Sequence, residues 1–502
     1  MKFLLFGLLC LLTLVRIWFL TVIAITPGEA YHWMCANQLD LAYFDGPGGT
    51  AALVAIGQNF LGATPLGIRI AFPLAAFAAS IAMYLLGRNC FGTPVGLLAA
   101  ALLNALPLFN LESVHASPTI PALASAIFAA VAAWRAIERK RDILSWVVTG
   151  LWIAVGTQFH YSVVLLWLSI LIICLSAPRY RPQLRHFGFY VATLLTVVAC
   201  LPGLMWNSQH DWAAFSTGTL QTVISFDPST WHYAFANVHA VLSMFGGLFL
   251  LAAFFVGFRT IRRHLRPRFA VGFATPFLLV WLFFALHGER DPADLLIAAS
   301  LTIPFAASLA FVDRSIFRII LPPALLLTAI TSAIALAFPH WHPQPASAAD
   351  ASLPWRQVAT AADSLRTEAE SVQPAAVFFI AKNPAYTAAL NFHLPRVARN
   401  TTSEVFLRES QDLATQFGIW PRYDDFVEAD EAPDEFFTEL RATNPYEGRS
   451  AIYITDETEL PQTIQGAFRL VSLAGTMNVD GPGDSSRILR FYFCEDYQTM
   501  TL

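Results

Sequence analysis

Residues 27–49 gather the side chains of this chain that are most able to do chemistry. The segment reads PGEAYHWMCANQLDLAYFDGPGG and holds three acids, Glu29, Asp40 and Asp45, among aromatic residues, without Lys or Arg. Carboxylates can act as general bases or as oxygen ligands of a divalent cation. The same composition is also typical of an aromatic belt with solvated acids at a membrane surface. The choice depends on the solvent that the segment faces.

The composition indicates a membrane protein. Of the 502 residues, 56% are hydrophobic and only 13% are charged, and the mean hydropathy is +0.53. A soluble protein of this size carries more charge. The net charge of −4 and the scattered basic residues argue against nucleic acid as a partner. The six cysteines are also scattered, so neither a disulfide framework nor a metal cluster is indicated.

Apolar runs long enough to cross ~30 Å of hydrocarbon recur along the first two thirds of the chain. We predict about eleven transmembrane helices, near residues 3–25, 67–87, 93–110, 118–136, 145–158, 161–177, 187–206, 237–258, 269–287, 293–312 and 316–338. The first run is too long for a signal-peptide core and lacks a small-residue cleavage site, so it is predicted to stay as an uncleaved span.

The basic residues set the predicted orientation. They cluster in alternate loops, such as 135–141, 179–185 and 259–268, and Arg290 is the exception in the intervening loops. The positive-inside rule therefore places the N-terminus in the cytoplasm and the first loop, residues 27–66, outside. Within that loop, TAALVAIGQNFLGA is predicted to lie as an amphipathic helix in the membrane interface.

The composition becomes polar from about residue 340. Strand-like and helix-like runs then alternate, beginning with AAVFFIA at 375–381 and YTAALNFHL after it. The predicted fold class is thus mainly α, with a polytopic transmembrane domain at 1–338 and a small extracytoplasmic α/β domain at 339–502. An Asn-Thr-Thr sequon at 400–402 fits glycosylation, although so short a match also arises by chance.

Three further stretches are predicted to face outward with the first loop. They are LESVHASPTIP at 111–121, TQFHYS at 157–162 and LPGLMWNSQHDWAAF at 201–215, and each places polar groups at a helix end. His160 lies between two apolar runs, where an ionisable side chain is costly unless it lines a cavity or reaches the interface.

These motifs resemble the membrane glycosyltransferases of the GT-C fold. The segments EAYHW, LAYFDGP, WNSQHDW and QFGIWP are similar to those of bacterial relatives of the protein O-mannosyltransferases and of the lipid A aminoarabinose transferases. The resemblance implies an integral, multi-pass protein of the bacterial inner membrane, surrounded by membrane lipids. It implies transfer of a sugar from a polyprenyl-phosphate carrier to a lipid, glycan or protein acceptor outside. Such a reaction needs a carboxylate base and donors or cations that stabilise the departing phosphate.

The resemblance also suggests which residues carry this reaction. Glu29 and Asp45 are the candidate catalytic residues. Candidate substrate-binding residues on the same predicted outer face are Tyr31, Trp33, His115, His160, Trp206, Asn207 and Arg290. Arg290 could clamp a phosphate or simply pair with a neighbouring acid in GERDPAD. No cofactor is predicted, and a divalent metal is not favoured because two of the family's acids are missing.

The chain departs from the family's pattern where the chemistry resides. Relatives carry Asp-Glu where this chain has Gly28-Glu29, and an acid followed by a cation where it has Asp45-Gly46. Where relatives carry a further Asp, this chain has Thr119, and where they carry a Lys, it has His160. Two hypotheses follow: an active transferase with a rearranged site, or a catalytically silent homologue that binds isoprenoid phosphate or glycan as an accessory protein. A transporter fits the number of spans but lacks the expected internal repeats.

Overall fold

The structure is a computed structural model. It describes residues 2–139, 142–176, 178–214, 265–286, 292–312, 350, 353–372, 376–394, 405–408, 415–425, 427–428, 442–480 and 486–498. The chain divides into two compact units, one made of Met1–Ala24 with Cys35–His342 and the other of Ile25–Met34 with Pro343–Leu502. The predicted spans near 237–258 and 316–338, Arg290, and the sequon at 400–402 lie outside the described residues.

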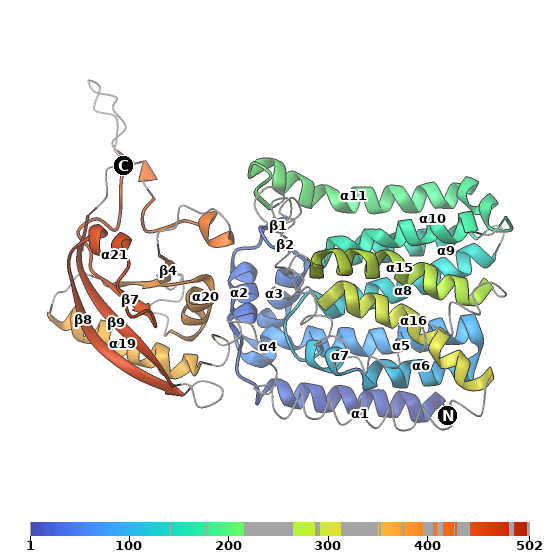
Figure 1. The fold of residues 1–502 in the computed structure, drawn as a ribbon, viewed down its shortest axis with the longest axis horizontal. Coiled ribbons are helices and arrows are strands. Elements are labelled where there is room, and N and C mark those ends of the chain that lie inside the picture. Colours follow the sequence, from blue (N-terminus) through green and yellow to red (C-terminus); the bar gives the residue numbers. More distant parts are fainter. Residues whose placement is uncertain are drawn as a thin grey trace, which may run out of the picture. The chain divides into compact units, whose positions relative to one another are not determined.

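The first unit is a bundle of apolar helices (Figure 1). Its elements are α1 (Lys2–Leu20), β1 (Ala42–Tyr43), β2 (Gly46–Pro47), α3 (Gly49–Leu61), α4 (Pro65–Arg69), α5 (Ala71–Phe91), α6 (Thr93–Ala105), α7 (Pro107–Glu112), α8 (Thr119–Glu138), α9 (Ile143–Thr157), η1 (Tyr161–Val164), α10 (Leu165–Ser176), η2 (Arg181–Arg185), α11 (Phe187–Gln209), α15 (Leu265–Leu286) and α16 (Pro292–Val312). Wherever the structure describes a predicted apolar run, that run coincides with helix.

Within the described residues, four helical stretches are long and apolar enough to cross a membrane. They are Phe3–Leu20, Pro65–Phe91, Thr119–Glu138 and Phe187–Gln209. Shorter apolar helices include Ile143–Thr157 and Tyr161–Ser176. The chain is thus a mainly helical membrane protein, and its predicted total of about eleven spans stays a prediction.

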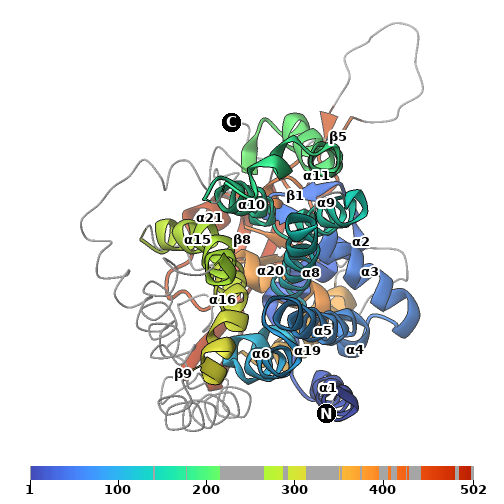
Figure 2. The ribbon, with the colours of Figure 1, turned by 90° about the vertical axis from the view of Figure 1, so that its right-hand side faces the viewer.

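Helix α8 is the centre of the bundle. It packs against α5, α9 and α16, and the end-on view of Figure 2 shows it surrounded by these helices. All of its residues except Phe128, Arg135 and Glu138 are buried. Eight of these seventeen buried residues are alanine, and small side chains allow helix backbones to approach closely where lipid gives no hydrophobic driving force.

Arg16 is a charge placed inside an apolar helix. It is 5% exposed and donates to Asn104 Oδ1 at 3.0 Å and Asn110 Oδ1 at 2.8 Å. Asn110 in turn donates to the carbonyls of Asn104 and Leu106, beside the break that Pro107 imposes between α6 and α7. The buried guanidinium and this helix break therefore satisfy one another's polar groups.

The second unit contains a mixed sheet with strand order β4-β3-β7-β9-β8. Its elements are α2, whose bounds Pro27–Asn37 extend past this unit, α19 (Trp355–Val372), β3 (Phe378–Ala381), α20 (Pro384–His393), β4 (Val405–Leu407), η5 (Gln416–Gly418), β5 (Val427–Glu428), β6 (Ala442–Thr443), β7 (Ala451–Thr455), α21 (Gln462–Ala467), β8 (Phe468–Asp480) and β9 (Ser486–Tyr497). Strand β3 is parallel to β4 and β7, whereas β9 is antiparallel to β7 and β8. The predicted C-terminal mixture of helices and strands is confirmed.

Alternating side chains of β3 give the sheet two covered faces. Phe379 packs with Val358 of α19 and Leu390 of α20. Phe378 lies in the opposite core with Ile464 of α21. This period-2 alternation is what a strand buried on both faces requires.

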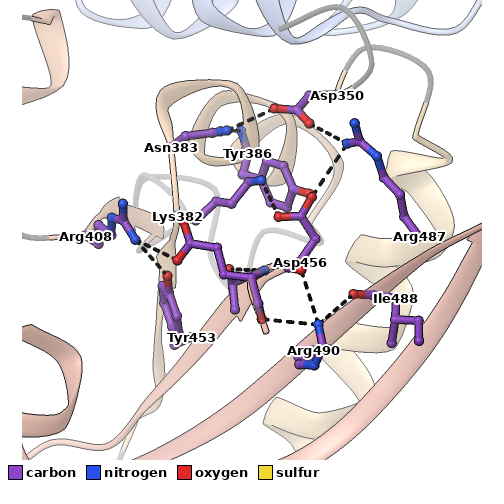
Figure 3. Close-up of polar contacts among 12 residues, drawn as sticks. Asp350, Lys382, Asn383, Tyr386, Arg408, Tyr453, Asp456, Arg487, Ile488 and Arg490 are labelled. Carbon is purple, nitrogen blue, oxygen red and sulfur yellow. Dashed lines mark hydrogen bonds and ion pairs between the residues drawn. The ribbon is translucent and has the colours of Figure 1, made fainter. Parts of the chain in front are cut away.

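Charged side chains meet where β3 and β7 end (Figure 3). Lys382 follows β3 and pairs with Asp456, which follows β7. Asp350 accepts from Arg487 of β9 at 2.9 Å and from Asn383 at 2.9 Å. Arg487 also lies 3.6 Å from Asp456. The network ties the residue that precedes α19 to three strands of the sheet.

Candidate functional site

The segment that carries Asp45 is a short hairpin. Strands β1 and β2 pair antiparallel, with Tyr43 opposite Gly46, so Asp45 lies in the turn, where it is exposed. The hydroxyl of Tyr43 donates to Cys35 O at 2.8 Å and accepts from Asp40 N at 3.1 Å. Burial raises the pKa of Tyr43, so its hydroxyl stays protonated. The hydrogen bonds of this hydroxyl anchor the hairpin that carries Asp45.

The hairpin is joined to the predicted outer loop at 157–162. Gly49 N donates to Gln158 O at 2.8 Å, and the Gln158 side chain donates to Ala199 O of α11 at 2.6 Å. A Cβ at position 49 would lie 2.3 Å from Gln158 O, so only glycine permits this approach. Strand β1 also contacts α11. The structure thus brings the hairpin, the loop of His160 and the end of α11 together.

Trp206 and Asn207 lie on the last turn of α11. Trp206 is fully buried, donates to Asp40 Oδ2 at 3.0 Å and stacks on His210 with ring centroids 4.2 Å apart. Asn207 is 1% exposed and donates to Gly203 O at 2.8 Å. The buried indole of Trp206 therefore holds the hairpin segment through Asp40.

His160 lies beside an acid that sequence reasoning missed. Its Nδ1 accepts from Ser162 N at 3.3 Å and is 2.6 Å from Ser162 Oγ. Asp294 Oδ1 lies 3.9 Å from the same nitrogen. Asp294 belongs to the first turn of α16 and is 4% exposed. The sequence does offer one signal for Asp294, because this acid stands at the start of an apolar span. A carboxylate there is costly unless it lines a polar site.

Glu29 lies in the second unit and has a structural task. Thr26 donates to Glu29 Oε2 from its backbone nitrogen and from its hydroxyl, each at 2.9 Å. Glu29 N lies 3.3 Å from Thr26 Oγ1, so the sequence TPGE is a reciprocal capping box at the start of α2. Glu29 is 2% exposed. Thr followed three residues later by Glu is a signal that the sequence offered for this role.

The EAYHW and QFGIWP motifs meet within the second unit. The ring centroid of Tyr31 lies 5.9 Å from that of Phe417 and 6.1 Å from that of Trp420. Trp33 contacts Phe392 edge-on, with centroids 5.2 Å apart. These aromatic contacts hold α2 against the α/β fold. Because Glu29 and Asp45 belong to different units, their shared cavity stays a prediction.

Other candidates have local contacts. His115 Nδ1 is 2.8 Å from Leu111 O, and Glu112 accepts from Ser117 Oγ at 2.6 Å. Thr119 is 2% exposed in the first turn of α8. Across the part of the chain that the structure describes, no three His, Cys, Asp or Glu side chains are grouped as a metal ion would require.

The segments of this site match a known family. Residues 45–206 match the model of the family described as dolichyl-phosphate-mannose-protein mannosyltransferase. The undecaprenyl phosphate-alpha-4-amino-4-deoxy-L-arabinose arabinosyl transferase of Pseudomonas aeruginosa (strain UCBPP-PA14) is 30% identical over 176 residues, which are 34% of this chain and 32% of the relative. Transferase 1 of that name from Pseudomonas fluorescens is 25% identical over 213 residues, 41% of this chain and 36% of the relative. The matches thus span about a third of the relatives' length.

Solved structures extend the likeness in fold to nearly the whole chain. ArnT from Cupriavidus metallidurans bound to undecaprenyl phosphate superposes with a TM-score of 0.62 and 12% identity, covering 97% of this chain and 98% of that one. The Archaeoglobus fulgidus oligosaccharyltransferase in complex with Zn and sulfate gives 0.53 and 13% identity, covering 80% and 62%. At such identities the likeness shows the fold alone. The family match at residues 45–206, together with this likeness in fold, confirms the resemblance of the chain to the membrane glycosyltransferases of the GT-C fold.

Proposed function

We propose that the chain transfers a sugar from a polyprenyl-phosphate carrier to a lipid, glycan or protein acceptor at the outer face of a bacterial inner membrane. The observation that carries the proposal is the joining of the Asp45 hairpin, the His160 loop and the end of α11 through Gly49, Gln158 and Asp40. The family match at 45–206 includes Asp45, Gly49, the His160 loop and α11 as far as Trp206. The relatives' names, which specify undecaprenyl phosphate sugars, support the carrier.

Asp45 is our first candidate for the general base. A sugar hydroxyl is a poor nucleophile near neutral pH, so a carboxylate that accepts its proton as it attacks speeds the reaction. Asp45 is exposed in a turn that buried groups anchor. Glu29 remains the second candidate, although its Oε2 already accepts two hydrogen bonds from Thr26. We therefore assign Glu29 first to positioning α2.

The leaving phosphate needs a hydrogen-bond donor as negative charge builds on it. His160 stands where relatives carry lysine and is our candidate for this donor. The carboxylate of Asp294 lies 3.9 Å from its Nδ1. Arg290 stays a further candidate for the phosphate. We place this chemistry in a transmembrane domain at 1–338 and assign 339–502 to an extracytoplasmic domain. The proposed orientation puts both the first loop and that domain outside.

The silent homologue remains the second candidate, and specific positions favour it. Gly28 stands where the family carries an aspartate. Thr119, a buried neutral residue, stands where the family carries a second aspartate. A chain that has lost two acids could keep its affinity for the carrier and lose the transfer step.

Substitution of the two acids separates the candidates. Asp45→Asn in purified full-length protein should lower the rate of sugar transfer by ~10²- to 10⁴-fold, the usual contribution of general-base catalysis. Glu29→Gln keeps an oxygen that can accept from Thr26, so it should retain the cap and lose activity only if Glu29 is the base. Glu368→Gln, an exposed acid of α19, is the matched control and should leave the rate unchanged.

One combination of results would contradict the proposal that the chain is a transferase. Wild-type protein would show no turnover with any undecaprenyl-linked sugar, yet bind undecaprenyl phosphate with an affinity that Asp45→Asn and Glu29→Gln leave unaltered. That outcome would establish the binding protein in place of the transferase.

A further inference from the structure

Two buried polar atoms of the candidate site lie near the same turn of α11. Tyr161 Oη and Asn207 Oδ1 are inaccessible and find no hydrogen-bond partner among the residues that the structure describes. Nearly all buried polar atoms in proteins are paired, and an unpaired one costs about 1–3 kcal/mol. Two such atoms on residues that both contact Gly203 point to a ligand that pairs with them.

Both atoms are placed by the same turn of α11. A Cβ at Gly203 would lie 2.8 Å from Tyr161 Oη, so the glycine leaves room for the phenol against the helix. Asn207, four residues later, donates its Nδ2 to Gly203 O at 2.8 Å, which directs the unpaired Oδ1 away from that carbonyl. We call Tyr161, Gly203 and Asn207 the Gly203 notch.

The notch lies among the segments already assigned to the site. Tyr161 follows His160 directly, and Asn207 follows Trp206, whose indole holds Asp40 of the hairpin segment. Gln158 of the same loop bonds both to Gly49 and to Ala199 of α11. A group bound in the notch would therefore lie close to the segments that carry His160 and Asp45.

The chemistry of the notch is that of a neutral polar ligand. An amide oxygen accepts hydrogen bonds, and a phenol both donates and accepts. Binding of phosphate calls instead for cations or clustered N–H donors. The described stretches that carry these three residues, 142–176 and 186–214, contain neither Lys nor Arg. Hydroxyl groups of a sugar ring match both atoms, whereas the oxygens of a phosphate dianion only accept and so match the phenol but not the amide oxygen.

We propose that the Gly203 notch binds hydroxyl groups of the donor's sugar ring and so distinguishes the sugar-bearing carrier from the bare one. The inference rests on the proposed function and adds the place where the sugar is held. A purely structural role makes the opposite prediction, because removal of an unpaired buried hydroxyl relieves a cost and should leave binding unchanged.

The test compares two ligands in Tyr161→Phe. Affinities of purified full-length protein are measured for undecaprenyl phosphate and for the tightest binder of a panel of undecaprenyl-phosphate-linked neutral hexoses and pentoses. Loss of a hydrogen bond to a substrate hydroxyl should weaken the sugar-linked ligand about 10-fold, with the affinity for undecaprenyl phosphate unchanged. Gly203→Ala, whose methyl group would crowd the phenol, should reproduce this selectivity. Tyr84→Phe on α5 removes another buried hydroxyl that has no hydrogen-bond partner in the described chain and should alter neither affinity.

Other results overturn the proposal. Equal weakening of both ligands in Tyr161→Phe would assign the notch to the carrier or to the fold, and no weakening of either would remove it from the binding site. Selective weakening without turnover in wild-type protein would refute the proposed transferase and leave the sugar-binding notch standing.

Discussion

At the scale of single residues, the half-buried His32 creates a dependence of stability on pH. Burial lowers the pKa of His32, in α2, from 6.5 to about 4, and the Glu29 carboxylate opposes this shift. As pH falls below 6.5, the unfolded chain binds the proton before the folded chain does, so folding loses stability. The full stability is present above pH 6.5 and falls progressively until pH reaches about 4.

We therefore expect acid to destabilise the second unit through this residue. The loss is at most about 1.4 kcal/mol for each pH unit in that window. Thermal unfolding of the wild type and of His32→Gln at pH 7 and pH 5 measures the effect, and the wild type should lose more of its melting temperature. Parallel losses in the two proteins would assign the acid sensitivity to other groups.

Single residues were also where prediction from the sequence was least complete. The resemblance selected Glu29, but its reciprocal bonds with Thr26 became evident only in the structure, although T-x-x-E had offered a signal. The sequence does not reveal the pairing of Asp294 with His160. Asp294 lies in α16, whereas His160 lies between α9 and η1, and proximity between residues so far apart in the chain leaves no local pattern. Asn207 and Trp206 were selected by motif, and the structure supplies their contacts.

At the scale of elements, the contact between the hairpin and the His160 loop depends on one glycine. Gly49→Ala would place a Cβ 2.3 Å from Gln158 O and force the two segments apart. Overpacking of this kind typically costs about 1–3 kcal/mol. We expect a lower melting temperature together with a loss of sugar transfer.

A glycine in open surroundings provides the control for that substitution. A Cβ at Gly7, in α1, meets nothing within 4 Å, so Gly7→Ala should keep both the melting temperature and the activity. A Gly49→Ala protein with unchanged stability and activity would show that the close approach is dispensable.

Elements followed from the sequence more fully than residue contacts did. Apolar length placed the helices because a span in lipid must satisfy its own backbone. The helix predicted at TAALVAIGQNFLGA is observed as α3, which buries Val54 and Ala55 and exposes Phe60, and its place in the membrane interface stays a prediction. The composition of residues 27–49 predicts plain loop where the hairpin forms, although the Asp45-Gly46 dipeptide is a turn signal. Its strands are only two residues long, too short for alternation to reveal them.

At the scale of the whole molecule, the positive-inside rule predicts which loops share a side. Reporter domains fused after residues 140 and 350 should appear on opposite sides of the membrane, because basic residues cluster near 135–141 and are nearly absent from the first loop. Reporters are scored by enzymatic activity that depends on the compartment. A common location for the two would refute the predicted orientation.

The whole-molecule feature that the sequence did not reveal is the membership of Ile25–Met34 in the same unit as Pro343–Leu502. A composition shift near residue 340 marks where a domain begins, but it says nothing about a short remote segment that joins it. The aromatic contacts of Tyr31 and Trp33 depend on tertiary packing, which leaves no periodic signal along the chain.

That interleaving has a consequence for synthesis. A ribosome releases Tyr31 and Trp33 early, whereas Phe392, Phe417 and Trp420, against which they pack, are translated hundreds of residues later. Until then the aromatic face of α2 has no native cover, and closure must wait for a contact of very high sequence separation. The packing of α2 against these aromatic residues is therefore a late step of biogenesis, and a chain truncated before Phe392 cannot complete it.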